Sequence, residues 1–462
     1  MNRHSIPSAV YIIFWMMSAG LVLTSCKKEQ NQPKPGGPGN PTNPSSLSIS
    51  GINPTTGPYN TKVVIKGTGF GSNMANDSVY INGVATIVSS VTDTELAVIV
   101  QPYTGTGDLV VKVAGIQKTG PVFTYIYTVQ TSQYAGKTNS DIDIGSYVDG
   151  PAAQAGFWLP AGLVLDHAGN LFVYDAGNSL IREITPPNNN GGAIVSTYSN
   201  VWYKESTFYG IEPAIYYGLS GQPGNFFAGG FLVSGGKGVW LVPPPNKSAG
   251  GALTPFPNDY GQWTPTGSVM DAAGNIYVPS INDVMIIYNS GPVSWALIGN
   301  PAVGEVPGAA GDVDGTYVFN VENQPVPADE PSFNGPTDVA LDPAGNILVA
   351  DQGNNKIRKV NPTTGLVSTF AGSGDNLEKD GTGAGASLSA PTLITTDSAG
   401  NSYVIDASSG GFNLRKITPA GVVSTLCTQC MVSPAGLVSD PLGHNLYYTE
   451  YIQGVVYQAS IL

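Results

Sequence analysis

A short phrase returns along the last two-thirds of the chain, and it constrains the fold more than any other feature of the sequence. Each copy has an Asp, two further residues, a Gly and an Asn between two apolar runs; copies begin at Asp166, Asp271, Asp342 and Asp397, with a looser one at Asp440. The Asp can accept hydrogen bonds from turn amides, and the Gly can take the positive φ that the turn requires. Such a repeat predicts an array of similar small sheets, which leaves function to loops and rims.

The fullest unit, residues 336–372, predicts four strands joined by tight turns. Its first two strands are apolar on both faces, so neighbouring sheets must cover them, as the blades of a propeller do. The interval from Asp166 to Asp271 is about twice one repeat, and the apolar runs in residues 229–242 predict a degenerate unit between them. We therefore expect six blades.

The last unit begins at Pro434 and holds three predicted strands instead of four. The segment between Val129 and Tyr134 is similar in sequence to the fourth strand of other units. We expect this segment to pair with the last blade and to close the ring, because closure removes exposed strand edges.

The units share the pattern Pro-x-Gly-(Ile/Val)-x-x-Asp-x-x-Gly-Asn-x-(Tyr/Phe)-Val-x-Asp-x-x-Asn-x-x-Ile-Arg, which is clearest from Pro160, Pro336 and Pro391 and weaker from Pro265 and Pro434. This pattern resembles the NHL repeat, and the resemblance implies an NHL-type β-propeller over residues 128–462. The second Asp and the Arg recur with the turn itself. We therefore expect structural roles for Asp175, Asp351, Asp406, Arg182, Arg358 and Arg415.

Residues 47–127 predict a separate unit made only of strands. Apolar residues alternate along its runs, and Asn82-Gly83 is a strong signal for a two-residue hairpin turn. Strands at this spacing indicate a β-sandwich. The motifs Ile52-x-Pro54-x-x-Gly57, Val64-x-x-Gly67-x-Gly69-Phe70 and Val79-x-Ile81-Asn82-Gly83 are similar to those of the IPT/TIG domain, which implies an immunoglobulin-like fold. We expect a spacer, with an adhesion module or a ligand platform as alternatives. The whole chain is thus expected to be all-β.

The first 25 residues have the character of an export signal. Arg3 supplies positive charge, an apolar core follows, and Leu23-Thr-Ser-Cys26 resembles the bacterial lipoprotein box in which Cys26 is lipidated. A plain signal peptide with an unmodified Cys26 is the alternative. Residues 26–46 contain mainly Pro, Gly, Asn, Ser and Thr beyond a charged start, so they predict a flexible tether. We expect a protein on the bacterial outer membrane, held at the cell surface by its lipid alone.

The charge and the cysteines exclude some classes of function. A formal net charge of −13 argues against nucleic-acid binding, which needs clustered Lys and Arg. Cys427 and Cys430 form a Cys-x-x-Cys pair without a thioredoxin-like context or a second ligand pair. In an exported protein such a pair predicts a local disulfide, or else two idle thiols.

The sequence nominates no catalytic residue, no metal site and no cofactor. Beyond the export signal the histidines are His167 and His444, both in repeat turns, which is too few for a zinc site. A calcium ion held by channel carbonyls and Asp stays open, because calcium accepts oxygen ligands. A nucleophile elbow or a phosphate-binding loop is not recognisable, so we expect a binding protein rather than an enzyme.

Aromatic residues in irregular positions are the candidates for ligand binding. Trp158 and Trp263 stand two residues before a predicted first strand, where partial packing is the alternative role. The others lie in long predicted insertions: Trp202, Tyr203, Tyr216 and Tyr217 before the degenerate unit, and Trp295 after the third. Aromatic faces on a rigid rim can bind the flat apolar faces of sugars, and long loops in compact repeats are often functional.

These observations lead to one hypothesis and two alternatives. We expect a non-catalytic cell-surface lipoprotein that binds a glycan at its propeller loops, within a nutrient-capture system. The first alternative is a scaffold or adhesin whose loops bind a protein. The second is a propeller enzyme, a lyase or hydrolase with its site in the channel.

Overall fold

The computed structural model describes residues 47–138, 147–200 and 331–462, apart from 179, 189–190 and 409. Between 200 and 331 it describes shorter stretches, namely residues 218–220, 231–235, 238–242, 252–255, 267–271, 273, 275–279, 281–287, 295–299 and 309–317. Among these residues no helix has the length and apolar character needed to cross a membrane.

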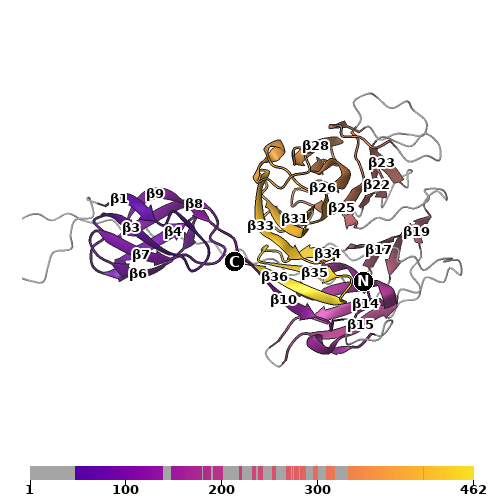
Figure 1. Ribbon diagram of the computed structural model, residues 1–462, viewed down its shortest axis with the longest axis horizontal. Coiled ribbons are helices and arrows are strands. Elements are labelled where there is room, and N and C mark those ends of the chain that lie inside the picture. The colour runs from indigo at the N-terminus through magenta and orange to yellow at the C-terminus, as the bar shows by residue number, and fades with distance from the viewer. Residues whose placement is uncertain are drawn as a thin grey trace, which may run out of the picture. The chain divides into compact units, whose positions relative to one another are not determined.

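The first described region is a β-sandwich (Figure 1). One sheet has the strand order β1-β3-β7-β6, with bounds Ser48–Asn53, Lys62–Thr68, Glu95–Ile99 and Ile87–Val91. The other has the order β2-β9-β8-β4-β5, with bounds Thr56–Gly57, Ile116–Tyr125, Gly107–Val113, Asp77–Ile81 and Val84–Ala85. Alternate residues of the strands, such as Val63 and Ile65 on β3, fill the core between the sheets. The alternation seen in the sequence therefore marks the buried faces correctly.

Six further sheets of the described residues form the blades of a propeller (Figure 1). Each blade runs from its first strand, beside the channel, to its fourth strand at the outside. In blades 1 to 3 these strands are β12 to β15 (Pro160–Leu165, Leu171–Asp175, Leu180–Thr185, Ile194–Asn200), β16 to β19 (Gly218–Ser220, Phe231–Gly235, Gly238–Val242, Ala252–Pro255) and β20 to β23 (Val269–Met270, Ile276–Pro279, Asp283–Ile287, Trp295–Gly299). The degenerate unit expected in residues 229–242 is confirmed, because β17 and β18 lie within it.

Blades 4 to 6 complete the ring. Their strands are β25 to β28 (Pro336–Leu341, Ile347–Asp351, Lys356–Val360, Leu366–Ala371), β30 to β33 (Pro391–Thr396, Ser402–Ser408, Gly411–Ile417, Val422–Met431) and β34 to β36 with β10 (Pro434–Ser439, Asn445–Glu450, Val455–Ile461, Val129–Ala135). Blades 1, 4 and 5 gain a short fifth strand from the segment that enters the blade, namely β11 (Gly150–Pro151), β24 (Gly315–Thr316) and β29 (Gly381–Thr382).

The ring closes as the sequence predicts. Strand β10 pairs antiparallel with β36, with Val129 opposite Ile461 and Gln133 opposite Tyr457, and Figure 1 shows the two strands side by side. The first strands of blades 6 and 1 are also in contact. The last blade is therefore completed by a strand from the start of the ring.

The recurring phrase forms the turn between the first and second strands. In blade 4, Asp342 Oδ1 accepts hydrogen bonds from Ala344 N (3.0 Å) and Asn346 N (2.8 Å), and Asn346 Nδ2 donates to Asp342 Oδ2 (2.8 Å). Gly345 has φ of 81°, a conformation that a side chain would disfavour. These bonds confirm the turn chemistry that the sequence implies.

The hydrophobic core of the ring lies between blades rather than within them. One cluster joins Val284 and Ile286 of blade 3 to Val339 and Val349 of blade 4. Similar clusters join blades 4 and 5, blades 5 and 6, and blades 6 and 1. Because each blade buries its two faces against its neighbours, the first strands are apolar on both sides.

Candidate functional site

A buried arginine fastens the entrance of blade 4. Arg358 on β27 is fully buried. Its Nη1 donates to the carbonyl of Ser332 and to Asp351 Oδ2, both at 3.0 Å. Its Nη2 donates to the carbonyl of Val313 (2.7 Å) and to Asp314 Oδ1 (2.6 Å). The guanidinium thus ties the second and third strands to the segment that enters the blade.

The same arrangement recurs in blades 1 and 5. We name each set an Asp–Arg–Asp clamp, made of an inner Asp on the second strand, an Arg on the third and an outer Asp on the entry segment. The sets are Asp175–Arg182–Asp149, Asp351–Arg358–Asp314 and Asp406–Arg415–Asp380. The inner Asp and Arg side chains are fully buried, whereas about half of each outer carboxylate is exposed. The structural roles expected for the inner Asp and the Arg are confirmed.

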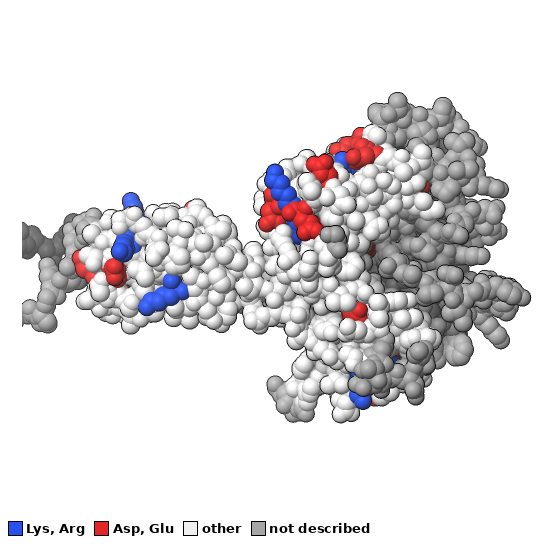
Figure 2. All heavy atoms as spheres, viewed as in Figure 1, with Lys and Arg blue, Asp and Glu red and all other residues white. Residues whose placement is uncertain are grey.

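Sequence analysis missed the outer half of each clamp. Each outer Asp stands directly before a Gly, as Asp149-Gly150, Asp314-Gly315 and Asp380-Gly381, at the start of the short fifth strand. This second repeated dipeptide was a signal in the sequence that could have located the entry segments. In the view of Figure 2, acidic side chains gather over the blades that hold β28 and β33, and most of the described surface is uncharged.

The electrostatics of the clamp are those of a structural site. Burial raises the pKa of Asp351 and of Asp406 to about 6, although hydrogen bonds and the adjacent Arg each act to lower it. For the outer Asp314, burial acts to raise the pKa, but the Thr369 amide and Arg358 outweigh it, so the pKa is lowered. Every one of these carboxylates is committed to hydrogen bonds within its own blade.

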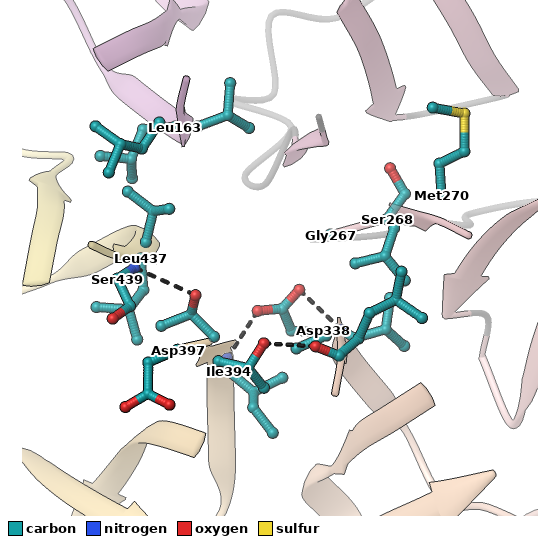
Figure 3. Close-up of a pocket in the computed structure, with 18 of the residues that line it drawn as sticks. Leu163, Gly267, Ser268, Met270, Asp338, Ile394, Asp397, Leu437 and Ser439 are labelled. Atoms are coloured by element: carbon teal, nitrogen blue, oxygen red, sulfur yellow. Dashed lines mark hydrogen bonds between the residues drawn. The ribbon is translucent and has the colours of Figure 1, made fainter. Parts of the chain in front are cut away.

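The channel at the centre of the ring holds a cavity of about 570 Å³. Its lining comes from the first strands of blades 1, 3, 4, 5 and 6. In each of these blades the lining begins at the third residue of the repeat, counted from its Pro, and extends to the Asp turn. It therefore reaches the face of the ring that carries these turns. Most of the strand side chains are Leu, Val, Ile and Met, with Ser268, Thr395 and Ser439 among the polar ones (Figure 3).

One carboxylate lies within this apolar lining. Asp338 stands where the repeat has Gly in three other blades, namely Gly162, Gly267 and Gly436, and it is more than nine-tenths buried. Its Oδ1 accepts a hydrogen bond from Val339 N (2.9 Å), and its Oδ2 accepts one from Ile394 N of the next blade (2.8 Å); Figure 3 shows Asp338 beside the channel. Burial raises the pKa of Asp338 to about 7, against the lowering effect of these two backbone bonds.

The carboxylate depends on a glycine in the preceding blade. A Cβ added to Gly267 would lie 1.7 Å from Asp338 Oδ1, so only Gly leaves room for the carboxyl group. Asp338 therefore bridges three blades: it belongs to blade 4, fits against blade 3 and bonds to blade 5. Sequence analysis did not single it out, although the replacement of Gly by Asp in the repeat was visible.

Trp158 lies at the opposite end of β12 from the cavity mouth. Its amide donates to Asp175 Oδ1 (2.7 Å), and Gly177 N donates to its carbonyl (2.9 Å). The indole packs on Gly177, where an added Cβ would lie 2.4 Å from Trp158 Cδ2. The side chain is half-buried. Blade 4 has Asn334 at the equivalent position, so the indole is an addition to the blade rather than part of its common core.

Comparison with known proteins agrees with this geometry. Residues 47–125 match the family model described as IPT/TIG domain, and residues 333–360 match the one described as NHL repeat. The chain carries an IPT/TIG domain followed by an NHL-repeat β-propeller. No curated protein matches the chain.

Solved structures share the fold of this IPT/TIG–NHL chain. A structural genomics protein of unknown function from Bacteroides thetaiotaomicron has a TM-score of 0.51 at 18% identity, and the match covers 92% of this chain and 99% of the other. A putative phosphatase and an auxiliary nutrient binding protein from the same organism each have a TM-score of 0.48 at 16% identity. These two matches cover 92% and 91% of this chain, and 98% and 99% of the other chains. At this level of identity the first match shows the fold alone.

Several of the candidate residues named from the sequence lie outside the described residues. These are Cys26, Trp202, Tyr203, Tyr216, Tyr217 and Trp263. The expectation that Trp295 lies in an insertion is wrong. It is the first residue of β23, the fourth strand of blade 3, and pairs with Ile287. The alternation of Trp295 and Leu297 was too short a pattern to separate a strand from a loop.

The remaining candidates lie in blades 5 and 6. A disulfide joins Cys427 and Cys430 on β33, with Cα atoms 5.9 Å apart. His444 stays within its repeat turn, where its amide donates to Asp440 Oδ1 (2.9 Å). Within the described residues, no three His, Cys, Asp or Glu side chains form a group that could hold a metal ion.

Proposed function

We propose that this protein is a non-catalytic, lipid-anchored surface protein that binds carbohydrate in a nutrient-capture system. The observation that carries the proposal is Trp158. Two hydrogen bonds fix the backbone of Trp158, and its half-buried indole packs on Gly177, so the side chain can serve as an aromatic platform on this face of the ring. Such platforms stack on the apolar faces of sugar rings.

Chain topology supports a binding face around this residue. Because the four strands of a blade are antiparallel, each fourth strand ends on the side opposite the Asp turns, and each first strand begins on that same side. Trp158 lies on the connection from β10 to β12. In chain order, the connection from β15 to β16 contains Trp202, Tyr203, Tyr216 and Tyr217, and that from β19 to β20 contains Trp263.

The hydrogen bonds that the recurring carboxylates make favour a binding protein over an enzyme. The carboxylates that recur in the repeats hold turns or clamp arginines, as Asp342 and Asp351 do, so they serve the fold. The location is proposed from the sequence: Cys26 would carry the lipid, and residues 27–46 would act as the tether. An auxiliary nutrient binding protein stands among the solved structures named above. Its likeness to this chain is too slight to carry an argument, and the proposal rests on the residues.

A glycan array, followed by affinity gels with the retained polysaccharides, tests the proposal. The mature protein should be retarded by at least one glycan, and Trp158→Ala should weaken this binding at least about tenfold because the stacking platform is lost. Leu442→Ala, at an exposed residue of an Asp turn on the other face, is the matched control and should bind like the wild type. Trp202→Ala and Trp263→Ala extend the test to the other connections. If the folded wild type binds no glycan, the carbohydrate proposal fails.

A protein ligand is the second candidate, favoured by one specific observation. Exposed apolar side chains stand on the same side as Trp158, on entry segments and on one turn between second and third strands: Val313, Leu377, Val432 and Ile452. Surfaces of this kind are common in protein contacts. Their replacement by Ser should weaken protein binding and leave glycan binding unchanged.

A further inference from the structure

The channel cavity contains a buried carboxylate that makes no ion pair with a described residue. Asp338 is buried in the lining, and its described partners are the two backbone amides of Val339 and Ile394. None of the described lining residues is Lys or Arg. A buried carboxylate without a cation is costly, so it must take up a proton or bind a positively charged group.

The carboxylate keeps the capacity for further bonds. Each carboxylate oxygen can accept about two hydrogen bonds, and each oxygen of Asp338 accepts one from the described residues. Five residues with hydroxyl side chains line the same cavity: Ser268, Thr395, Thr396, Ser398 and Ser439. The Thr395 oxygen accepts a hydrogen bond from Ser439 N at 3.3 Å. The site can thus offer a strong acceptor at Asp338, with hydroxyl groups elsewhere in the cavity.

The composition of the lining discriminates between classes of ligand. Anions are disfavoured, because Asp166, Asp271, Asp342 and Asp397 line the cavity as well. A bare metal ion would need six or more oxygen ligands, whereas most of the strand side chains here are apolar. A neutral sugar ring would gain from an aromatic platform, and the described lining contains no Trp, Tyr or Phe.

We propose that the channel cavity binds a small organic ammonium ion, with Asp338 as its counter-ion and the Leu, Val, Ile and Met side chains against its hydrocarbon body. A volume of about 570 Å³ is in the range of small-molecule sites. Gly267 leaves the space in which the carboxyl group stands. This site lies at the Asp-turn side of the ring, away from Trp158, so it is independent of the proposed carbohydrate face.

Three ligands that differ in one group provide the test: cyclohexylammonium, cyclohexanol and cyclohexanecarboxylate, measured by isothermal titration calorimetry at pH 8. The ammonium ion should bind, and the neutral and anionic analogues should bind at least about tenfold more weakly because they lack the charge pair. Calcium chloride and potassium chloride, titrated alone, cover the metal alternatives. Equal binding of cyclohexanol, or binding of calcium in place of the ammonium ion, overturns the proposal.

Variants locate the site. Asp338→Asn and Asp338→Gly, the second of which copies the Gly of other blades, should each reduce ammonium affinity at least about tenfold. Gly267→Ala keeps the carboxylate but forces it to move, and it should have a similar effect. Melting curves identify any variant that fails to fold. Trp158→Ala should not change ammonium binding. Unchanged affinity in the folded Asp338 variants, or an absence of binding in the wild type, also overturns the proposal.

The pH dependence provides an independent readout. With the pKa of Asp338 at about 7, protonation should weaken ammonium binding about tenfold for each pH unit below that value. The other titratable groups of the lining are Asp166, His167, Asp271, Asp342 and Asp397, and Asp342 is paired with Lys359 at 2.8 Å. The dependence must therefore disappear in Asp338→Asn. If it persists there, another group controls it and the assignment to Asp338 is wrong.

Discussion

Blades 1, 4 and 5 carry an Asp–Arg–Asp clamp, whereas blades 3 and 6 fold without one. In blade 4, Arg358 pairs across the sheet with Val349 of the second strand. The same register position holds Met285 in blade 3 and Tyr457 in blade 6. Among the described residues, the clamped blades have a fifth strand and the other blades have four. The clamp is therefore not what makes a blade; it fastens the segment that enters one.

Blades 3 and 6 each contain a buried acid but no arginine at the clamp position. Glu450 stands at the inner-Asp position of blade 6, whereas Asp283 lies on the third strand of blade 3, at the register position of Lys356 in blade 4. Glu450 in blade 6 and Asp283 in blade 3 are almost fully buried. Glu450 Oε1 and Asp283 Oδ1 have no hydrogen-bond partner in the described part of the chain. Burial raises the pKa of both groups, that of Asp283 to about 7. In blade 6 the ring of Tyr457 stacks on Tyr448, with centroids 5.3 Å apart, which replaces polar bonds with aromatic packing.

The largest effect is expected when Arg358 of blade 4 is replaced by Met, the residue at the same register position in blade 3. Arg358→Met should lower the free energy of unfolding by about 3–5 kcal/mol, because it leaves the buried Asp351 without its partner. Urea unfolding followed by circular dichroism measures the loss. The double variant with Asp351→Asn removes the stranded charge and should recover part of it. A loss below about 1 kcal/mol for Arg358→Met would mean that the clamp contributes little.

A smaller effect is expected at the entrance to blade 6, where a disulfide stands in place of a clamp. Replacing Cys427 and Cys430 together by Ser should lower stability by about 2 kcal/mol, as the chain-entropy treatment gives for so short a loop. Thermal melting of the wild type under reducing conditions should match the double variant. Identical melting of oxidised and reduced protein would show that the bond does not hold this segment.

The smallest effect is expected at Asp283, and it depends on pH. Its folded pKa is raised from 3.8 to about 7, so the protonated form is favoured in the fold. Stability from this group is complete below pH 4 and is lost as pH rises towards 7 and beyond. Asp283→Asn should therefore stabilise the protein at pH 8 by on the order of 1–2 kcal/mol.

The same variant should have no advantage at pH 4. Urea unfolding at the two pH values measures the difference, and Asp375→Asn, at an exposed carboxylate, is the control that should leave both curves unchanged. Equal effects of Asp283→Asn at both pH values would show that ionisation of Asp283 does not lower the stability of the folded protein.

Much of the fold could be predicted from the sequence because it repeats. Asp342 and Gly345 specify their turn locally, and four further copies confirm the unit. The closing strand could be predicted because the last unit needed a partner and one early segment resembled it. The site could not be predicted in the same way, since the cavity depends on how five first strands converge. Asp338 stands where the repeat pattern has Gly, and this difference is visible in the sequence. Its burial, however, follows only from its fit against Gly267.

The closing sheet also sets the order in which the ring can form. Val129 and Ile461 pair although almost the whole propeller separates them in sequence, and contacts between such distant residues are slow to form. One edge of strand β10 therefore stays unpaired until the rest of the ring, up to β36, has been synthesised. A nascent chain whose β10 edge is still unpaired can pair with a neighbouring copy. The yield of folded protein should therefore fall when many incomplete chains meet before β36 is available.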